Sequence, residues 1–192
     1  MNEDPSNGYE AVAAHFVRAR RAAIGEREVR QWARTLGPGA AVLDLGCGHG
    51  VPVTQALLEE GLRVTGVDAS PALLAEYRSR FPGLDTECAR VETAKTLTRQ
   101  FDAIVAWGLI FLLESKAQEL VISRIAGALA PGGRFLFTAP EQKVSWQDAL
   151  TGRESLSLGR ARYAELLAAS GMSLLAEFED AGQNHYYSAQ RV

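Results

Sequence analysis

The sequence is poor in cysteine and histidine, which limits the kinds of site it can build. Its 192 residues contain two cysteines and three histidines. Cys47 and Cys88 do not have Cys-x-x-Cys spacing, and two lone thiols argue against a disulfide framework and fit the reducing cytoplasm. His15, His49 and His185 do not fall at metal-ligand spacing. We therefore expect a cytoplasmic protein without a bound metal.

A long apolar run and an excess of basic residues are also missing. Residues 103–113 are apolar but too few to cross a membrane, and they indicate a buried strand with its exit loop. Residues 1–8 are polar and acidic and lack the apolar core of a signal peptide. The net charge of −3 argues against a general nucleic-acid binder, which needs a basic face. We expect neither a membrane nor a nucleic acid as partner.

The chain has enough apolar residues for a substantial core. Hydrophobic residues make up 47% of the sequence, and the mass of 20.7 kDa corresponds to one ordinary domain. We expect a single domain over residues 1–192, with residues 1–37 as an N-terminal helical lid. Residues 139–159 interrupt the alternation of strands and helices, so we expect a loop there on the substrate side. A monomer and a homodimer are both compatible with the sequence.

The most informative segment is residues 42–50, which read Val-Leu-Asp-Leu-Gly-Cys-Gly-His-Gly. An apolar strand ends in an acid and runs into a glycine-rich turn, which a helix follows. Glycine lacks a Cβ, so such a turn can pass close under a bulky ligand. A second strand, 62–67, ends in Asp68, about 20 residues beyond the glycines, where a carboxylate accepts hydrogen bonds from both ribose hydroxyls. The pattern is typical of a nucleotide-binding βαβ unit.

The spacing of the glycines separates two kinds of nucleotide ligand. A dinucleotide fingerprint is Gly-x-Gly-x-x-Gly, whereas Gly50 comes one position early and Val51 takes the expected place. Asp44, two residues before the first glycine, would repel a pyrophosphate at the helix N-terminus. A carboxylate at this position suits a ligand with a cationic amine, such as S-adenosylmethionine, which has a ribose and no phosphate.

These segments resemble the class I S-adenosylmethionine-dependent methyltransferases. The resemblance rests on the acid-x-Gly-x-Gly-x-Gly of residues 44–50, on Gly-Val-Asp-Ala-Ser at 66–70, on Phe-Asp at 101–102 and on Leu-x-Pro-Gly-Gly at 129–133. It covers about residues 8–192. It implies an α/β fold, a Rossmann-like three-layer sandwich with helices on both faces. Its seven-stranded, mostly parallel sheet would have the order 3-2-1-4-5-7-6, with the last strand antiparallel.

The periodicity of apolar residues predicts alternating elements that fit this fold. The expected strands are 40–45, 62–67, 85–89, 101–107, 134–138, 172–179 and 184–191. The expected helices are 8–23, 25–36, 51–60, one that starts at Pro71 with Ser70 as its cap, 93–99, 115–130 and 160–170. In an open α/β sheet the ligand binds beyond the carboxyl ends of the strands, so we expect the site there.

The resemblance implies roles for the residues around the turn. Asp68 and its neighbour Ala69 would lie at the ribose, with Asp68 accepting from the diol. Gly46 and Gly48, with Cys47 as a small residue between them, would lie beneath the methionine part of the cofactor. Asp44 would reach the cofactor's amino group, directly or through water, although it could also cap the turn.

Adenine recognition is expected to differ from the usual pattern of the family. Its members commonly have an acid after the third strand that accepts from the adenine amino group. Here residues 87–93 place no Asp at that position. The backbone at Arg90 and Val91, or the carboxylate of Glu92, is expected to substitute.

Aromatic residues from two other regions are expected at the ligand. Trp107 ends the fourth strand, where its indole would meet the sulfonium by cation–π attraction or pack an aromatic substrate; a purely structural Trp is the alternative. Tyr9, Phe16 and Arg20 on the first helix would close over the ligand, with Phe16 toward the substrate. Arg20 would pair with the cofactor's carboxylate, a role for which Arg18 competes.

Substrate residues are expected from the region that varies in function across this fold. They are Glu141, Trp146, Arg153, His185 and Tyr186. Histidine titrates near working pH, which makes His185 a candidate general base for a hydroxyl or amine nucleophile, with Glu141 as a second catalytic candidate. A structural histidine is the alternative reading of His185.

These observations predict methyl transfer from S-adenosylmethionine to a small-molecule acceptor by in-line displacement. The sulfonium is already a good leaving group, so the protein mainly fixes geometry and removes water. Residues 106–109, Ala-Trp-Gly-Leu, differ from the Asn-Pro-Pro-Tyr type of motif that suits planar nitrogens. Two alternatives stay open, which are an intramolecular lyase or cyclase reaction on the same cofactor and a binding module without turnover.

Overall fold

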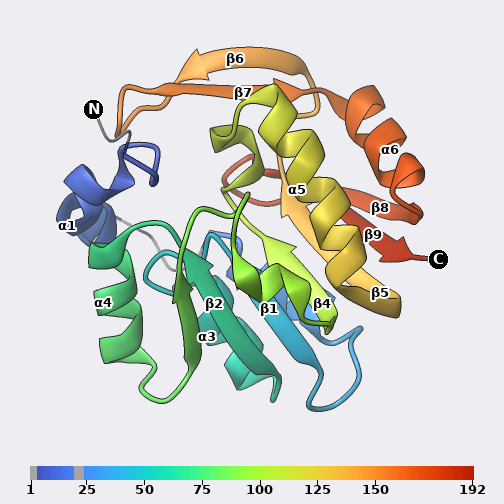
Figure 1. The fold of residues 1–192 in the computed structure, drawn as a ribbon, viewed down its shortest axis with the longest axis horizontal. Helices are drawn as coiled ribbons and strands as arrows, with labels where there is room; N and C mark the ends of the chain where they lie inside the picture. Colours follow the sequence, from blue (N-terminus) through green and yellow to red (C-terminus); the bar gives the residue numbers. More distant parts are fainter. Residues whose placement is uncertain (1–3, 20–23) are drawn as a thin grey trace.

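The computed structural model describes residues 4–19 and 24–192, and within them seven strands form one sheet (Figure 1). Its strand order is β3-β2-β1-β4-β5-β9-β8. The strands are β1 Ala41–Leu45, β2 Arg63–Asp68, β3 Asp85–Cys88, β4 Phe101–Ala106, β5 Leu129–Thr138, β8 Met172–Glu179 and β9 His185–Arg191. β9 runs antiparallel to both neighbours and every other pair is parallel. Numbered within this sheet alone, the order is 3-2-1-4-5-7-6, so the predicted topology is confirmed.

The helices lie close to the predicted positions. They are α1 Tyr9–Ala19, α2 Glu26–Ala33, α3 Val53–Glu59, α4 Pro71–Arg80, α5 Ser115–Ala128 and α6 Arg160–Ala169, with short 3-10 helices η1 Lys95–Thr98 and η2 Ile110–Leu112. Ser70 caps α4 as predicted, because its hydroxyl accepts from the backbone N–H of Leu73 at 3.1 Å. Every helix within residues 4–19 and 24–192 is too short or too polar to traverse a bilayer.

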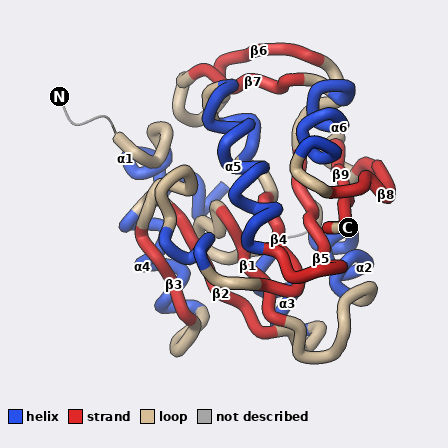
Figure 2. Tube along the Cα trace, turned by 45° about the vertical axis from the view of Figure 1, so that its right-hand side comes forward, coloured by secondary structure: helices blue, strands red, loops and turns tan. Residues whose placement is uncertain are grey.

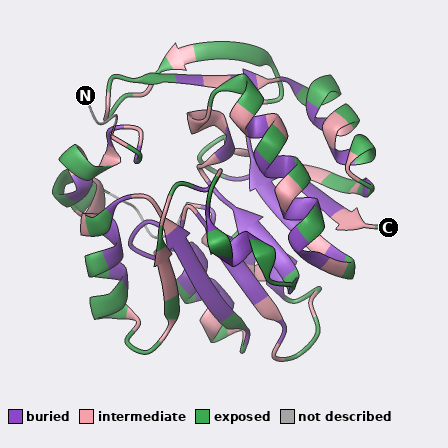
Figure 3. Ribbon diagram, viewed as in Figure 1, coloured by how far each residue is buried: buried purple, intermediate pink, exposed green. Residues whose placement is uncertain are grey.

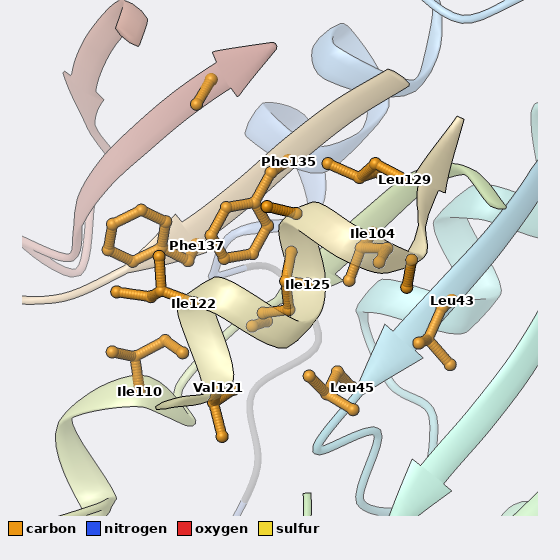
Figure 4. Close-up of a cluster of buried hydrophobic side chains, with 14 of the residues drawn as sticks. Leu43, Leu45, Ile104, Ile110, Val121, Ile122, Ile125, Leu129, Phe135 and Phe137 are labelled. Atoms are coloured by element: carbon orange, nitrogen blue, oxygen red, sulfur yellow. The ribbon is translucent and has the colours of Figure 1, made fainter. Parts of the chain in front are cut away.

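The helices cover both faces of the sheet and bury its central strands (Figures 1 and 3). Successive side chains of a strand point to opposite faces. Leu43 therefore packs in the cluster that Ile125 of α5 joins (Figure 4), whereas Val42 packs in the cluster that Trp32 of α2 and Leu57 of α3 join. The result is the expected three-layer sandwich.

Residues 139–159, expected as a loop, instead contain a two-stranded antiparallel hairpin. Its strands are β6 Lys143–Gln147 and β7 Glu154–Leu158. The hairpin arches over the sheet at the carboxyl ends of the central strands (Figures 1 and 2). β6 is largely exposed, so it shows no apolar periodicity of a core strand. Polar bonds help to hold the hairpin, including Gln118 Nε2 of α5 to the carbonyl of Leu156 at 2.9 Å and Ser157 Oγ to the carbonyl of Pro140 at 2.6 Å.

Candidate functional site

A cavity of about 200 Å³ lies at the carboxyl ends of β1, β2 and β4, where the sequence predicts the ligand. We call it the glycine-turn cavity. It brings together most of the residues proposed for the cofactor. Those that line it are Tyr9, Asp44, Gly46, Cys47, Gly48, Asp68, Ala69, Val91, Glu92 and Trp107, and the substrate candidate Phe16 lines it as well.

The glycines of the turn are required by its backbone and its neighbours. Gly46, Gly48 and Gly50 have φ values of 76°, 53° and 85°, the left-handed region that glycine tolerates best. A Cβ on Gly50 would overlap the ring of Phe81 beyond α4. At Gly48 the nearest atom to such a Cβ would be 3.6 Å away on Phe16. The turn is therefore packed against α4 at Gly50 and open to the cavity at Gly48.

Cys47 fills the turn rather than presenting a reactive thiol. It is buried, and burial raises the pKa of its thiol well above the usual value. The backbone N–H groups of Gly46 and Cys47 both donate to the carbonyl of Val67, at 2.7 and 3.0 Å. This bond pair ties the turn to the end of β2.

Asp44 is a buried carboxyl at the floor of the cavity. Asp44 is 1% exposed, and Thr54 Oγ1 donates to Asp44 Oδ2 at 2.6 Å. Burial raises the pKa of Asp44 to about 7, and the nearby Asp68 charge acts in the same direction. A ligand cation at this position would favour the ionised form.

Asp68 is oriented by the backbone on either side of it. Its Oδ2 accepts from the N–H of Gly48 and its Oδ1 from the N–H of Ser70, each at 2.8 Å. Burial raises the pKa of Asp68, and these backbone donors oppose the shift. A carboxylate has about four acceptor sites, so Asp68 stabilises the turn and still has acceptor capacity toward the cavity.

The loop after β3 is shaped by a residue that sequence reasoning missed. Arg124 of α5 donates to the carbonyls of Val91, Glu92 and Ala94 at 3.0, 2.5 and 2.6 Å. Val91 and Glu92 thereby line the cavity. Arg90 does not line it: its side chain is 46% exposed and pairs with Glu92 at 3.1 Å. A contact over some 30 positions of sequence leaves no local pattern to detect.

Trp107 lines the cavity and is held from behind by Tyr186. The indole Nε1 donates to the Tyr186 hydroxyl at 2.6 Å, and that hydroxyl donates to Asp180 Oδ2 at 2.8 Å. Tyr186 itself is fully buried and does not line the cavity, so the expected substrate contact is corrected. The alternation of β9 turns Tyr186 toward the α2–α3 layer and its neighbour Tyr187 toward α5.

The N-terminal helix is fixed over the site. Tyr9 and Phe16 lie edge to face with ring centroids 5.4 Å apart, and both line the cavity. The carboxylate of Glu10 accepts from Ser70 Oγ at 2.5 Å and from the N–H of Ala72 at 3.0 Å, which attaches α1 to the start of α4. Arg20 lies outside the described residues; Arg18 is described but does not line the cavity.

The turn of the hairpin meets the N-terminal segment. Tyr9 donates its hydroxyl to Asp148 Oδ2 at 3.2 Å. Arg153 lies 3.7 Å from Asp4 Oδ2, is 45% exposed and does not line the glycine-turn cavity. Arg153 therefore does not contact a ligand in this cavity as expected. It joins the hairpin to the N-terminal segment instead. The Asp148 side chain also closes the hairpin turn by accepting from the N–H of Thr151 at 2.8 Å.

Three further candidates lie next to the glycine-turn cavity rather than in it. Glu141, Trp146 and His185 line an adjoining cavity of about 180 Å³. His185 Nε2 is 3.3 Å from Glu177 Oε1, and its Nδ1 is 3.6 Å from Glu179 Oε1. Its role as a general base stays a prediction. Within residues 4–19 and 24–192, no group of three or more His, Cys, Asp or Glu side chains is arranged to hold a metal ion.

Residues 5–7 also line the glycine-turn cavity, although no motif in the sequence indicates that they belong there. Asn7 has a φ of 53°, a conformation that asparagine tolerates better than most residues. Its side-chain Nδ2 is buried and has no hydrogen-bond partner within the described residues. A buried donor in this state is costly unless a ligand or water accepts from it.

Comparison with known proteins gives the same assignment for the central part of the chain. A family model described as a methyltransferase domain matches residues 42–133. The ubiquinone biosynthesis O-methyltransferase of Idiomarina loihiensis is 33% identical over 114 residues, which are 56% of this chain and 46% of that protein. The trans-aconitate 2-methyltransferase of Paracidovorax citrulli is 30% identical over 152 residues, 69% of this chain and 58% of that protein. The chain thus spans about half the length of the curated relatives it matches.

A solved structure with the same fold covers nearly the whole chain. The 1,6-didemethyltoxoflavin-N1-methyltransferase of Burkholderia thailandensis, with bound 1,6-didemethyltoxoflavin and S-adenosylhomocysteine, superposes with a TM-score of 0.75 at 23% identity. The match covers 96% of this chain and 84% of that one. This likeness shows that the chain has the fold of that enzyme, and the family model identifies residues 42–133, which hold the glycine turn, as similar to a methyltransferase domain.

Proposed function

We propose that the chain binds S-adenosylmethionine in the glycine-turn cavity and transfers its methyl group to a small-molecule acceptor. The observation that carries this proposal is a pair of carboxyls on either side of the turn, Asp44 fully buried and Asp68 partly so. No lysine or arginine of the described residues lines the cavity. Such a wall repels a pyrophosphate and stabilises a ligand with a cationic amine and sulfur.

The residues present fit the parts of that cofactor. Asp44 would accept from the ammonium group, whose charge offsets the unfavourable burial of the carboxylate. Asp68 would accept from the ribose hydroxyls with the lone pairs that its backbone donors leave. Val91 and Glu92 would line the adenine side, in a loop that Arg124 fixes.

A donor for the cofactor's carboxylate is supplied by Asn7 in this proposal. Its Nδ2 is buried in the cavity wall and lacks a protein partner among the described residues. A carboxylate accepts from an amide N–H without any change of protonation. The role expected for Arg20 would then be shared with, or taken by, Asn7.

We also propose that α1 and the β6–β7 hairpin act together as the cover of the site. Glu10 attaches α1 to α4, and Tyr9 bonds to Asp148 in the hairpin turn. The pair Asp4–Arg153 adds a second link. A cover made of two joined segments keeps water away from the reacting atoms, which methyl transfer requires.

In this proposal methyl transfer does not require an ionisable side chain that forms a covalent bond with a reactant. When bound, S-adenosylmethionine would supply a methyl group on a sulfonium. The nucleophilic atom of the acceptor would bond to the methyl carbon as the carbon–sulfur bond breaks, which leaves S-adenosylhomocysteine, and the proton of the acceptor would pass to solvent. The chain orients the two reactants and removes water from between them. The apolar residues Leu109, Phe111 and Leu113, which also line the cavity, suit this task.

Calorimetry and product analysis test the proposal. We expect S-adenosylmethionine and S-adenosylhomocysteine to bind the purified chain, and NADH and NADPH not to bind. With a panel of small acceptors, the expected product is S-adenosylhomocysteine. Methylthioadenosine would indicate intramolecular cleavage, and tight binding without turnover across the panel would indicate a binding module. Saturable binding of NADH would overturn the assignment of the cavity.

A further inference from the structure

The cavity beside the hairpin, which we call the adjoining cavity, has the size and walls of an acceptor site. Phe111 and Asn184 line both it and the glycine-turn cavity. Trp146 packs on Phe111 with ring centroids 5.4 Å apart. Its volume of about 180 Å³ compares with about 150 Å³ for an engineered cavity that binds benzene. A single substituted ring therefore fits next to the cofactor position.

Asn184 has one polar atom left for a ligand. Its backbone N–H donates to Asp180 Oδ1 at 3.0 Å, and its carbonyl accepts from the N–H of Asp180 at 3.2 Å. Its side-chain Nδ2 donates to both oxygens of Asp180, at 3.0 and 2.8 Å. No hydrogen bond within the described residues involves the side-chain oxygen, Oδ1.

The orientation of the Asn184 amide follows from the hydrogen-bonding chemistry of Asp180. Asp180 also accepts from the Tyr186 hydroxyl and from the N–H of Gly182, each at 2.8 Å. A carboxylate with this many donors around it is an acceptor only, so the Asn184 side chain must turn its NH₂ toward Asp180. The carbonyl oxygen is then not bonded to Asp180, and Asn184 lines both cavities.

The charge of the walls points to the kind of acceptor. Carboxyl groups line the two cavities at Asp44, Asp68, Glu92, Glu141, Asp148 and Glu179. Neither cavity is lined by a lysine or arginine from residues 4–19 or 24–192. An anionic acceptor would meet repulsion from these carboxyl groups and find no lysine or arginine of the described residues in the walls, whereas an amine or hydroxyl would find an acceptor atom.

We propose that Asn184 is a specificity-determining residue whose side-chain oxygen accepts a hydrogen bond from the amine or hydroxyl to be methylated, so that the acceptor is a ring compound with an amine or hydroxyl and not a carboxylate. An amine that binds as its ammonium form loses a proton to solvent before its lone pair attacks the methyl group. This inference rests on the proposed function, because it takes the glycine-turn cavity as the cofactor site. It deepens that function by naming the class of acceptor.

Binding of four matched probes to the full chain saturated with S-adenosylhomocysteine tests the proposal. Benzyl alcohol is a neutral donor and benzylamine a cationic donor, whereas benzoate is anionic and anisole is neutral without a donor. Saturation-transfer NMR titrations should give affinities for the two donors about threefold to tenfold above those for benzoate and anisole, the effect of one net hydrogen bond. Equal affinities across the set, or binding of none, would overturn the inference.

Substitution of Asn184 tests whether this residue causes the preference for donor probes. Asn184→Ala should remove the difference between benzyl alcohol and anisole while the affinity for S-adenosylhomocysteine stays within about twofold. Gln147→Ala, which deletes an exposed amide in β6, is the matched control and should keep the preference. A folded Asn184→Ala protein that still prefers benzyl alcohol would contradict the role of Asn184. Failure of S-adenosylhomocysteine to bind the wild-type chain would instead overturn the proposed function.

Discussion

The indole of Trp107 donates its N–H to the hydroxyl of Tyr186 over 2.6 Å, and this bond joins the end of β4 to β9 behind the glycine-turn cavity. The same hydroxyl donates to Asp180, the residue that orients Asn184. A wall of the proposed cofactor site and a wall of the proposed acceptor site therefore share one buried network. Such networks are costly when one member is removed, because the remaining partners are left without bonds.

Two tyrosines adjacent in sequence give a matched test of this network. Tyr186→Phe leaves the Trp107 N–H without its acceptor and should lower the free energy of unfolding by about 1–3 kcal/mol. Tyr187→Phe removes a buried hydroxyl that has no hydrogen-bond partner in the described part of the chain, and should change stability by less than about 0.5 kcal/mol. Urea denaturation measures both. Equal losses in the two variants would show that the hydroxyl of Tyr186 has no special role.

Asp68 should dominate cofactor affinity. Asp68→Ala would remove the two charge-assisted hydrogen bonds that we propose to the ribose, each worth roughly 1.5–3 kcal/mol, and would also release the N–H of Gly48 in the turn. The affinity for S-adenosylmethionine should fall by at least about tenfold, since about 1.4 kcal/mol is one decade. Asp85→Ala, at an exposed position where β3 begins, is the control. Calorimetry that gives wild-type affinity in a folded Asp68→Ala protein would refute the assignment.

Ionised Asp44 should lower the stability of the ligand-free protein. Its folded pKa of about 7 lies above its ordinary value of 3.8, so the folded state holds the proton more tightly. Below about pH 4 this proton contributes fully to the free energy of unfolding of the ligand-free protein. As the pH rises toward 7 the contribution is lost, which lowers the free energy of unfolding by up to roughly 4 kcal/mol. Asp44→Asn should remove most of this dependence and be the more stable protein at about pH 8, as measured by urea denaturation at both pH values.

Binding should show the opposite preference at the same residue. A cationic amine binds the ionised carboxylate, so the affinity of the wild-type protein for S-adenosylmethionine should fall by up to about tenfold per pH unit as the pH drops below about 7. The amide introduced by Asp44→Asn has no charge to gain, so this variant should bind weakly and with little pH dependence between about pH 5.5 and 7.5. A wild-type affinity that does not change over this range would place the ammonium group elsewhere.

Local patterns were sufficient for the sheet and for the floor of the site. The turn at residues 44–50 and Asp68 are close in sequence, and parallel strands bring their ends to one edge, so motif and topology together place them. The early position of Gly50 has a cause that no local pattern shows, because the ring that a Cβ there would overlap belongs to Phe81, some 30 positions away. The alternation of apolar residues predicted the order of elements because most of them bury one face.

Features that depend on distant polar contacts could not be predicted in this way. The hairpin is held by Gln118 and Ser157 through backbone carbonyls, which leave no hydrophobic pattern. Arg124 acts on a loop some 30 positions away. The direction of Tyr186 depends on the register of β9 against β5, and a shift of one residue would exchange its face with that of Tyr187. Residue type alone therefore placed Tyr186 at the substrate, and the fold places it behind Trp107.

Two substitutions of Asn7 should lower the affinity for S-adenosylmethionine by different amounts. Asn7→Asp keeps the shape of the side chain and its tolerance of a positive φ, but replaces the unpartnered donor with a carboxylate. If Nδ2 donates to the cofactor's carboxylate, the affinity for S-adenosylmethionine should fall about tenfold or more in Asn7→Asp, because two like charges then meet. Asn7→Gly, which keeps the backbone conformation and removes the donor without adding charge, should cost only about threefold to tenfold. A structural role alone would reverse this order, since Asp would support the turn better than Gly, and calorimetry on the two folded variants decides between the two cases.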